Sequence, residues 1–150
     1  MAAEPQKVGA ILFACTMNAV RSPMAAALMR HLGAKGLHVE SAGVRAGALD
    51  PLAVEAMEEI GLEIGRHRPR RFEDLEDGSF DLVITLSPEA QHKAVELTRT
   101  AATEVEYWPT MDPTAVEGSR EQRLAAYRAV RDQLLERLKR RFLAPKAADT

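Results

Sequence analysis

A single cysteine and an arginine six residues later are the residues in this chain best suited to covalent chemistry. They lie in the segment Cys15-Thr-Met-Asn-Ala-Val-Arg21-Ser22-Pro23. An almost entirely apolar run, residues 8–14, comes directly before the cysteine, and a run of good helix formers follows the proline. A strand, a tight loop and a helix N-terminus can bring backbone N–H groups around one point, and the helix dipole adds positive charge there. The segment therefore predicts an oxyanion cradle made by residues 16–22.

Three side chains in and beside this cradle are suited to catalysis. Arg21 can hold two oxygens of a tetrahedral oxyanion with its planar guanidinium. The same positive surroundings stabilise a thiolate at Cys15, which could then attack phosphorus, and the Ser22 hydroxyl can donate to that thiolate. The alternative for a lone cysteine at a strand end is simple packing. We predict Cys15, Arg21 and Ser22 as catalytic, and a substrate-binding loop made of Thr16, Met17, Asn18, Ala19, Val20, Arg21 and Ser22.

The elements that position this loop alternate along the chain. Apolar runs predict strands over residues 8–14, 37–41, 81–86 and 105–108. Helices are expected over 24–32 with Ser22 as N-cap, and over 52–60, 88–98 and 119–142. This alternation predicts βαβ units and a mostly parallel sheet, in which ligands bind beyond the carboxyl ends of the strands. The loops 15–22, 41–50, 86–88 and 109–119 are therefore the places to look for a site.

Composition sets limits on the class of protein. The 150 residues are 46% hydrophobic and 28% charged with a net charge of −2, which fits one soluble globular domain and is far less positive than is normal for a domain that binds nucleic acid through a basic surface. One cysteine permits neither an internal disulfide nor a zinc cluster of several thiolates, and favours the cytoplasm. No leader or membrane span is visible. We expect a single domain over residues 1–150, with a core of about 8–142 and flexible termini, and neither a nucleic-acid nor a membrane partner.

Residues 11–25 strongly resemble the N-terminal signature of the low molecular weight protein tyrosine phosphatases and of their relatives, the thioredoxin-coupled arsenate reductases. Further similar segments follow in the family's order, at residues 39–44, 61–68, 81–86 and 108–113. The resemblance covers roughly residues 8–140. It implies a single-domain, three-layer α/β fold, with a four-stranded parallel sheet in the order 2-1-3-4 and helices on both faces.

The resemblance also assigns roles to residues. It implies that Cys15 is the nucleophile of a phosphocysteine intermediate and that Asp112 is the general acid, which protonates the leaving group and then assists water. It implies that Asn18 is held by Ser41, with His67 as a further candidate support; asparagine also tolerates a left-handed backbone. Asp-Pro is also a common turn, and a surface histidine is the alternative for His67. No cofactor or metal is expected, because backbone amides and Arg21 already compensate the phosphoryl charge.

The chain departs from the family pattern in three places. Met17 stands where glycine is usual, Val20 replaces a second cysteine found in many members, and residues 114–118 lack the aromatic side chains of phosphotyrosine-specific members. The expected function is a cysteine-dependent phosphatase acting on a phosphorylated protein, phosphotyrosine proteins included, or on a small phosphate ester. Phosphate, arsenate and vanadate are the expected oxyanion ligands.

Two alternatives stay open. A thioredoxin-type relay needs two further cysteines, so an arsenate reductase with the single Cys15 would require an external thiol. A non-catalytic oxyanion-binding or regulatory module on the same fold is the other alternative, although pure binding needs neither a thiolate nor an acid.

Overall fold

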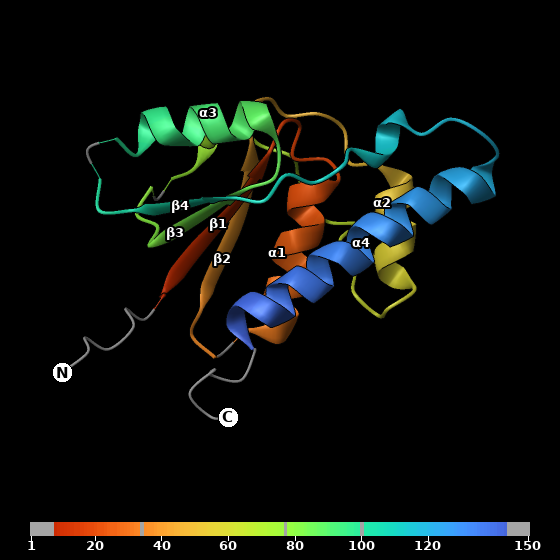
Figure 1. Ribbon diagram of the computed structural model, residues 1–150, viewed down its shortest axis with the longest axis horizontal. Helices are drawn as coiled ribbons and strands as arrows, with labels where there is room; N and C mark the ends of the chain where they lie inside the picture. The colour runs from red at the N-terminus through yellow and green to blue at the C-terminus, as the bar shows by residue number, and fades with distance from the viewer. Residues whose placement is uncertain (1–7, 34, 77, 100, 144–150) are drawn as a thin grey trace.

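The computed structural model describes residues 8–33, 35–76, 78–99 and 101–143 (Figure 1). Strands and helices alternate along the chain as predicted, and the termini expected to be flexible lie outside the described residues. The elements are β1 (Ala10–Cys15), α1 (Arg21–Leu32), β2 (His38–Gly43), α2 (Pro51–Glu58), η1 (Phe72–Asp74), β3 (Leu82–Thr85), α3 (Pro88–Leu97), β4 (Glu104–Tyr107), η2 (Pro113–Ala115) and α4 (Arg120–Phe142).

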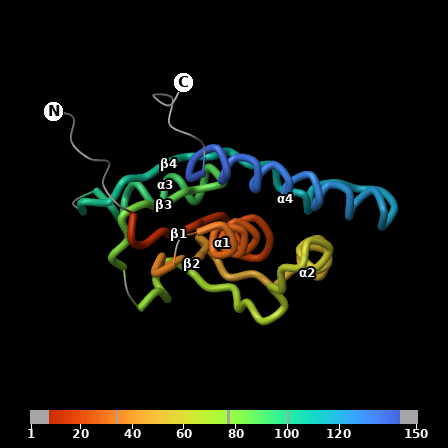
Figure 2. Tube along the Cα trace, turned by 90° about the horizontal axis from the view of Figure 1, so that it is seen from below, coloured from red at the N-terminus to blue at the C-terminus, as the bar shows by residue number. Residues whose placement is uncertain are grey.

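The four strands form one parallel sheet in the order β2-β1-β3-β4, which confirms the predicted order. Helices α1, α2 and α4 lie on one side of the sheet and α3 lies on the other (Figures 1 and 2). Because successive side chains of a strand point to opposite faces, the side chains of β1 pack into the hydrophobic cores on both faces of the sheet. Phe13 and Cys15 pack with the α1–α4 core, whereas Leu12 and Ala14 pack under α3.

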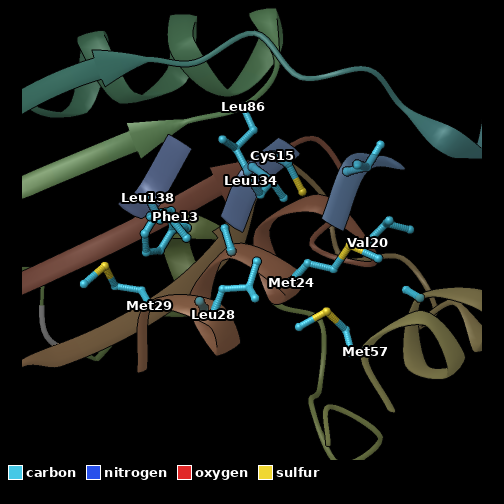
Figure 3. Packing of buried hydrophobic residues seen from close by; sticks show 14 of the residues in the cluster. Phe13, Cys15, Val20, Met24, Leu28, Met29, Met57, Leu86, Leu134 and Leu138 are labelled. Carbon is cyan, nitrogen blue, oxygen red and sulfur yellow. The ribbon is translucent and has the colours of Figure 1, made fainter. Parts of the chain in front are cut away.

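The larger core lies between β1, α1 and α4, where Phe13, Leu28 and Leu138 are fully buried (Figure 3). Each such side chain contributes roughly 1.5–3 kcal/mol through removal of apolar surface from water. The apolar stripe predicted for the long helix is buried at Leu124, Tyr127, Val130, Leu134 and Leu138, while Leu135 is half-buried. Among the described residues, no helix combines the length and apolarity needed to cross a membrane.

Helix starts agree with the sequence at three of the four long helices. Asp50, Ser87 and Ser119 cap α2, α3 and α4 with side-chain acceptors. The predicted N-cap at Ser22 is wrong: α1 begins at Arg21, Val20 occupies the N-cap position, and no side chain caps this end. The reason is that the Ser22 hydroxyl is engaged with Cys15 and Asn18 instead, so that the first backbone N–H groups of α1 are left without a side-chain acceptor.

Candidate active site

A pocket of about 190 Å³ opens where β1 ends and α1 begins. Three of the four loops selected from the sequence contribute to it; the loop at 86–88 does not. Of the predicted binding loop, Met17, Ala19, Val20 and Arg21 line the pocket, whereas Thr16, Asn18 and Ser22 are not among the lining residues. The full lining is Cys15, Met17, Ala19, Val20, Arg21, Gly47, Ala48, Asp50, Asp112 and Thr114.

The loop between β1 and α1, residues 16–22 and hereafter the cradle loop, turns its carbonyl groups toward a second loop. Four backbone N–H groups in residues 44–50 donate to carbonyl oxygens in residues 15–19 at 2.8 to 3.3 Å. Among the described residues, the backbone N–H groups of residues 16–20 have no hydrogen-bond acceptor. The first N–H groups of an α-helix likewise have no acceptor within the helix. Because its carbonyl groups accept hydrogen bonds from residues 44–50, the cradle loop has its backbone N–H groups available to bind an oxyanion.

Two backbone features allow this loop shape. Asn18 has the predicted left-handed conformation, with φ of 53°. Gly43 lies against the loop so closely that a Cβ there would come within 2.8 Å of the Asn18 nitrogen and 2.9 Å of the Thr16 oxygen. The end of β2 therefore requires glycine so that the cradle loop can rest on it.

The buried Asn18 side chain determines which way the hydrogen bonds at Cys15 run. Its Nδ2 donates to Ser22 Oγ at 2.8 Å and to Ser41 Oγ at 3.0 Å, while the Arg70 N–H donates to its Oδ1 at 3.0 Å. Since the Ser22 oxygen accepts from Asn18, its own hydrogen is free for Cys15 Sγ, 2.9 Å away. The Ser22 hydroxyl therefore donates to the sulfur, an arrangement that stabilises a thiolate.

His67 also contacts Asn18. Its Nε2 lies 3.0 Å from Asn18 Oδ1 and 3.2 Å from the Asn18 carbonyl oxygen. Both of these oxygens are acceptors, so Nε2 carries a hydrogen and Nδ1 is the nitrogen that titrates. Burial lowers the pKa of His67, and the nearby Arg30 lowers it further. The ring is therefore neutral at pH 7. Of the three residues predicted as loop supports, Asn18 thus contacts both Ser41 and His67.

Arg21 and Asp112 meet at the mouth of the pocket. Arg21 as a residue is only 8% exposed, and its guanidinium donates to the Thr110 carbonyl at 2.9 Å, which fixes its direction. Asp112 Oδ2 lies 3.9 Å from Arg21 Nη2, and the other carboxylate oxygen accepts from the Thr114 N–H and hydroxyl. Thr114 therefore leaves Oδ2 as the oxygen on the Arg21 side, where it can exchange a proton with a bound group.

Several residues of the site were not identified from the sequence. Asp50, interpreted there only as part of a helix start, lines the pocket and accepts from the Tyr127 hydroxyl at 2.5 Å. Burial and this carboxylate raise the pKa of Tyr127. Met17 and Gly47 pack together: a Cβ on Gly47 would lie 3.1 Å from the Met17 methyl carbon. These contacts join positions about 30 or more residues apart, so periodicity along the chain gives no signal for them.

Comparison with known proteins identifies relatives of this chain by sequence and by fold. Residues 10–148 match the family described as low molecular weight phosphotyrosine protein phosphatase. An arsenate reductase of Bacillus licheniformis is 37% identical over 87% of this chain and 92% of its own length.

Two solved structures show the same fold. YwlE of Bacillus subtilis, described as an arginine phosphatase in a mutant form whose active-site cysteine is replaced by a phosphorylated serine, is 27% identical with a TM-score of 0.68, covering 87% of this chain and 91% of that one. The tyrosine phosphatase amsI of Erwinia amylovora has a TM-score of 0.71 at 19% identity, with 92% and 93% of the two chains covered.

Proposed function

Because the chain belongs to the low molecular weight phosphotyrosine protein phosphatase family, we propose that it is a cysteine-dependent phosphatase that hydrolyses phosphate monoesters. The observation that carries this proposal is the hydrogen bond from Ser22 to Cys15 Sγ, directed by Asn18 and set beside the Arg21 guanidinium. A sulfur that only packs in a core needs no such donor. A sulfur that attacks phosphorus and later departs as a thiolate does.

In the first step, the phosphoryl group of the substrate sits in the cradle loop, held by its amides and by Arg21. The Cys15 thiolate forms a bond to phosphorus while the bond from phosphorus to the leaving oxygen breaks. Asp112 Oδ2, protonated, gives its proton to that oxygen, so an alcohol or phenol leaves. Arg21 and the amides stabilise the charge on the three equatorial oxygens throughout.

In the second step, water attacks the phosphocysteine. Asp112, now a carboxylate, takes a proton from the water as the bond from oxygen to phosphorus forms. The bond from sulfur to phosphorus breaks and Cys15 departs as a thiolate, which the Ser22 hydroxyl stabilises. In the relative YwlE, the serine that replaces a cysteine in a mutant form carries a phosphoryl group, which supports a covalent phosphoenzyme at this position.

Arsenate reduction is the second candidate, favoured by the names of curated relatives such as the Bacillus licheniformis enzyme. Reduction of arsenate to arsenite needs two electrons, which thiols supply by forming a disulfide. Cys15 is the only cysteine of the chain, so it cannot form that disulfide within the molecule. Arsenate reduction by this protein would therefore depend on an added thiol, whereas phosphate-ester hydrolysis depends only on water.

The pocket lining bears on the choice of substrate. Within the described part of the chain no aromatic side chain lines it; Trp108 is buried, and Tyr107 is exposed but is not a lining residue. Met17 supplies the large apolar contact instead, and Asp50 and Asp112 add carboxylates. We propose a phosphorylated protein or a small phosphate ester as substrate, and phosphate, arsenate and vanadate as competing ligands. Because the relative YwlE is described as an arginine phosphatase, a phosphoarginine peptide belongs in the substrate panel beside phosphotyrosine and alkyl phosphates.

The test compares hydrolysis of p-nitrophenyl phosphate by the native protein and by Cys15→Ser, between pH 5 and 7.5. The proposal predicts turnover by the native protein, no measurable turnover by the variant, and retained vanadate binding in both. A parallel assay follows arsenite formation with and without glutathione. Turnover that survives in Cys15→Ser would overturn the mechanism. Arsenite formation without any ester hydrolysis would assign the protein to the second candidate.

A further inference from the structure

A second cleft, larger than the pocket over Cys15, lies between α1 and the segment that follows α2. The tube in Figure 2 shows this segment passing beside α1. We call it the cationic cleft. Its volume is about 440 Å³, compared with about 190 Å³ for the active-site pocket. The residues that line it are Pro23, Ala27, Arg30, His31, Leu62, Glu63, Ile64, Arg66 and His67.

The charges in this cleft are not balanced. The Arg30 guanidinium is anchored by a bond to the Val39 carbonyl at 2.8 Å, and neither it nor Arg66 forms an ion pair with any described residue. Burial and the nearby Arg70 lower the pKa of Arg30. The cleft's single carboxylate, Glu63, accepts from the Gly65 N–H and offsets only one of the two guanidinium charges. Two guanidinium groups and two imidazoles thus face an open cavity.

This arrangement contrasts with that of several other arginines, which are paired with carboxylates. Arg70 is paired with Glu40, Arg71 with Asp74, and Arg128 with Glu59. At those positions a carboxylate of the protein compensates the charge. In the cationic cleft Glu63 offsets one positive charge and an anion from solution could offset the other, and a guanidinium fork is well suited to two oxygens of a phosphate.

His67 connects the cationic cleft to the cradle loop. Its Nε2 hydrogen contacts Asn18 in the cradle loop, and the same ring lines the cleft. The charged groups around the ring are Arg30 and His31 from α1, and Glu63, Arg66 and Arg70 from its own segment. An anion among these groups would stabilise a proton on Nδ1, and a charged ring donates more strongly to Asn18.

We propose that the cationic cleft is a second anion site, which binds a small phosphate-bearing molecule and signals its occupancy to the cradle loop through the contact between His67 and Asn18. Binding and proton uptake at His67 are then coupled, so that each favours the other. The proposal does not depend on phosphatase activity, because it concerns binding at residues outside the active-site pocket.

The test titrates inorganic pyrophosphate into protein whose Cys15 has been carboxymethylated, which fills the active site. The imidazole signals of the four histidines are followed by NMR at pH 7. His31 and His67 are expected to shift with one saturable curve, while His38 and His92 stay in place. The pKa of His67, measured by the same signals, is expected to rise at saturation. A His31 signal that does not move would overturn the proposal.

Arg66→Gln and Arg68→Gln provide a matched pair. Both arginines are exposed, but only Arg66 lines the cleft. Loss of one charged contact is expected to weaken pyrophosphate binding about tenfold in Arg66→Gln and by less than about twofold in Arg68→Gln. Equal weakening in the two variants would mean nonspecific attraction, and no weakening in either would place the anion elsewhere. Both results contradict a site at the cationic cleft.

Discussion

Replacement of Ser22 by alanine removes the hydroxyl that donates to Cys15 Sγ at 2.9 Å. The effect differs between the two chemical steps. In the first, the lost donor makes the thiolate less stable but more nucleophilic, so phosphorylation of Cys15 changes little. In the second, the thiolate must depart without its hydrogen bond. A hydrogen bond to a charged group contributes about 1.5–3 kcal/mol, which corresponds to a loss of about 10- to 150-fold in the rate of phosphocysteine hydrolysis.

Stopped-flow hydrolysis of p-nitrophenyl phosphate separates these steps. Ser22→Ala is expected to release close to one equivalent of p-nitrophenol in a burst, followed by a steady state slower by about 10- to 150-fold, with a reduced KM because the phosphoenzyme accumulates.

Ser41→Ala is the matched control. It removes the other acceptor of the Asn18 amide, at 3.0 Å, without touching Cys15. It is expected to lower the free energy of unfolding by about 1–3 kcal/mol, as loss of a buried partner does, yet to give no burst. A steady-state rate for Ser22→Ala within about threefold of the native rate would refute the assignment of the hydroxyl to the leaving thiolate. Equal slowing without a burst in both variants would mean that Ser22 only supports the conformation of the cradle loop.

Three further predictions concern the surrounding residues. Asp112→Asn is expected to slow hydrolysis of alkyl phosphates about 100-fold more than hydrolysis of esters with good leaving groups, and equal slowing across a leaving-group series would remove Asp112 from the acid role. Burial lowers the pKa of His67 in the folded protein. Below about pH 6.5, this histidine therefore binds more protons in the unfolded chain than in the folded protein. The unfolding free energy should therefore fall with decreasing pH by up to about 1.4 kcal/mol per unit, and this slope should flatten in His67→Gln; an unchanged slope in calorimetry argues against the assignment. Gly47→Ala brings a Cβ against Met17, so KM should rise about two- to fivefold, with recovery when Met17→Ala is added; no recovery would mean that the two side chains do not share the pocket wall.

The order of elements could be predicted because each signal is local. The apolar run before Cys15, the Ser87-Pro88 start of α3 and the apolar stripe of α4 each depend on neighbouring residues only. The segment from Cys15 to Arg21 likewise carries its chemistry within seven positions, and the left-handed backbone at Asn18 follows from its residue type.

The supports of the site could not be predicted in the same way. Ser22 has the sequence of a helix cap, but tertiary contacts with Asn18 and Cys15 engage its hydroxyl. Asp50 caps α2, as its sequence suggests, but its place in the pocket wall depends on Tyr127, 77 residues further along the chain. Hydrogen bonds of this kind depend on how the layers pack, and no pattern along the chain encodes them.

The measurement that tests the central claim most directly is a rapid acid quench during turnover of a phosphate ester, followed by peptide mass spectrometry. The account predicts that phosphate is found on the peptide that contains Cys15, that the amount increases in Ser22→Ala, and that none forms in Cys15→Ser at native rates. Steady turnover in native protein and in Ser22→Ala, with no phosphate on Cys15 at any time point, would contradict a phosphocysteine mechanism.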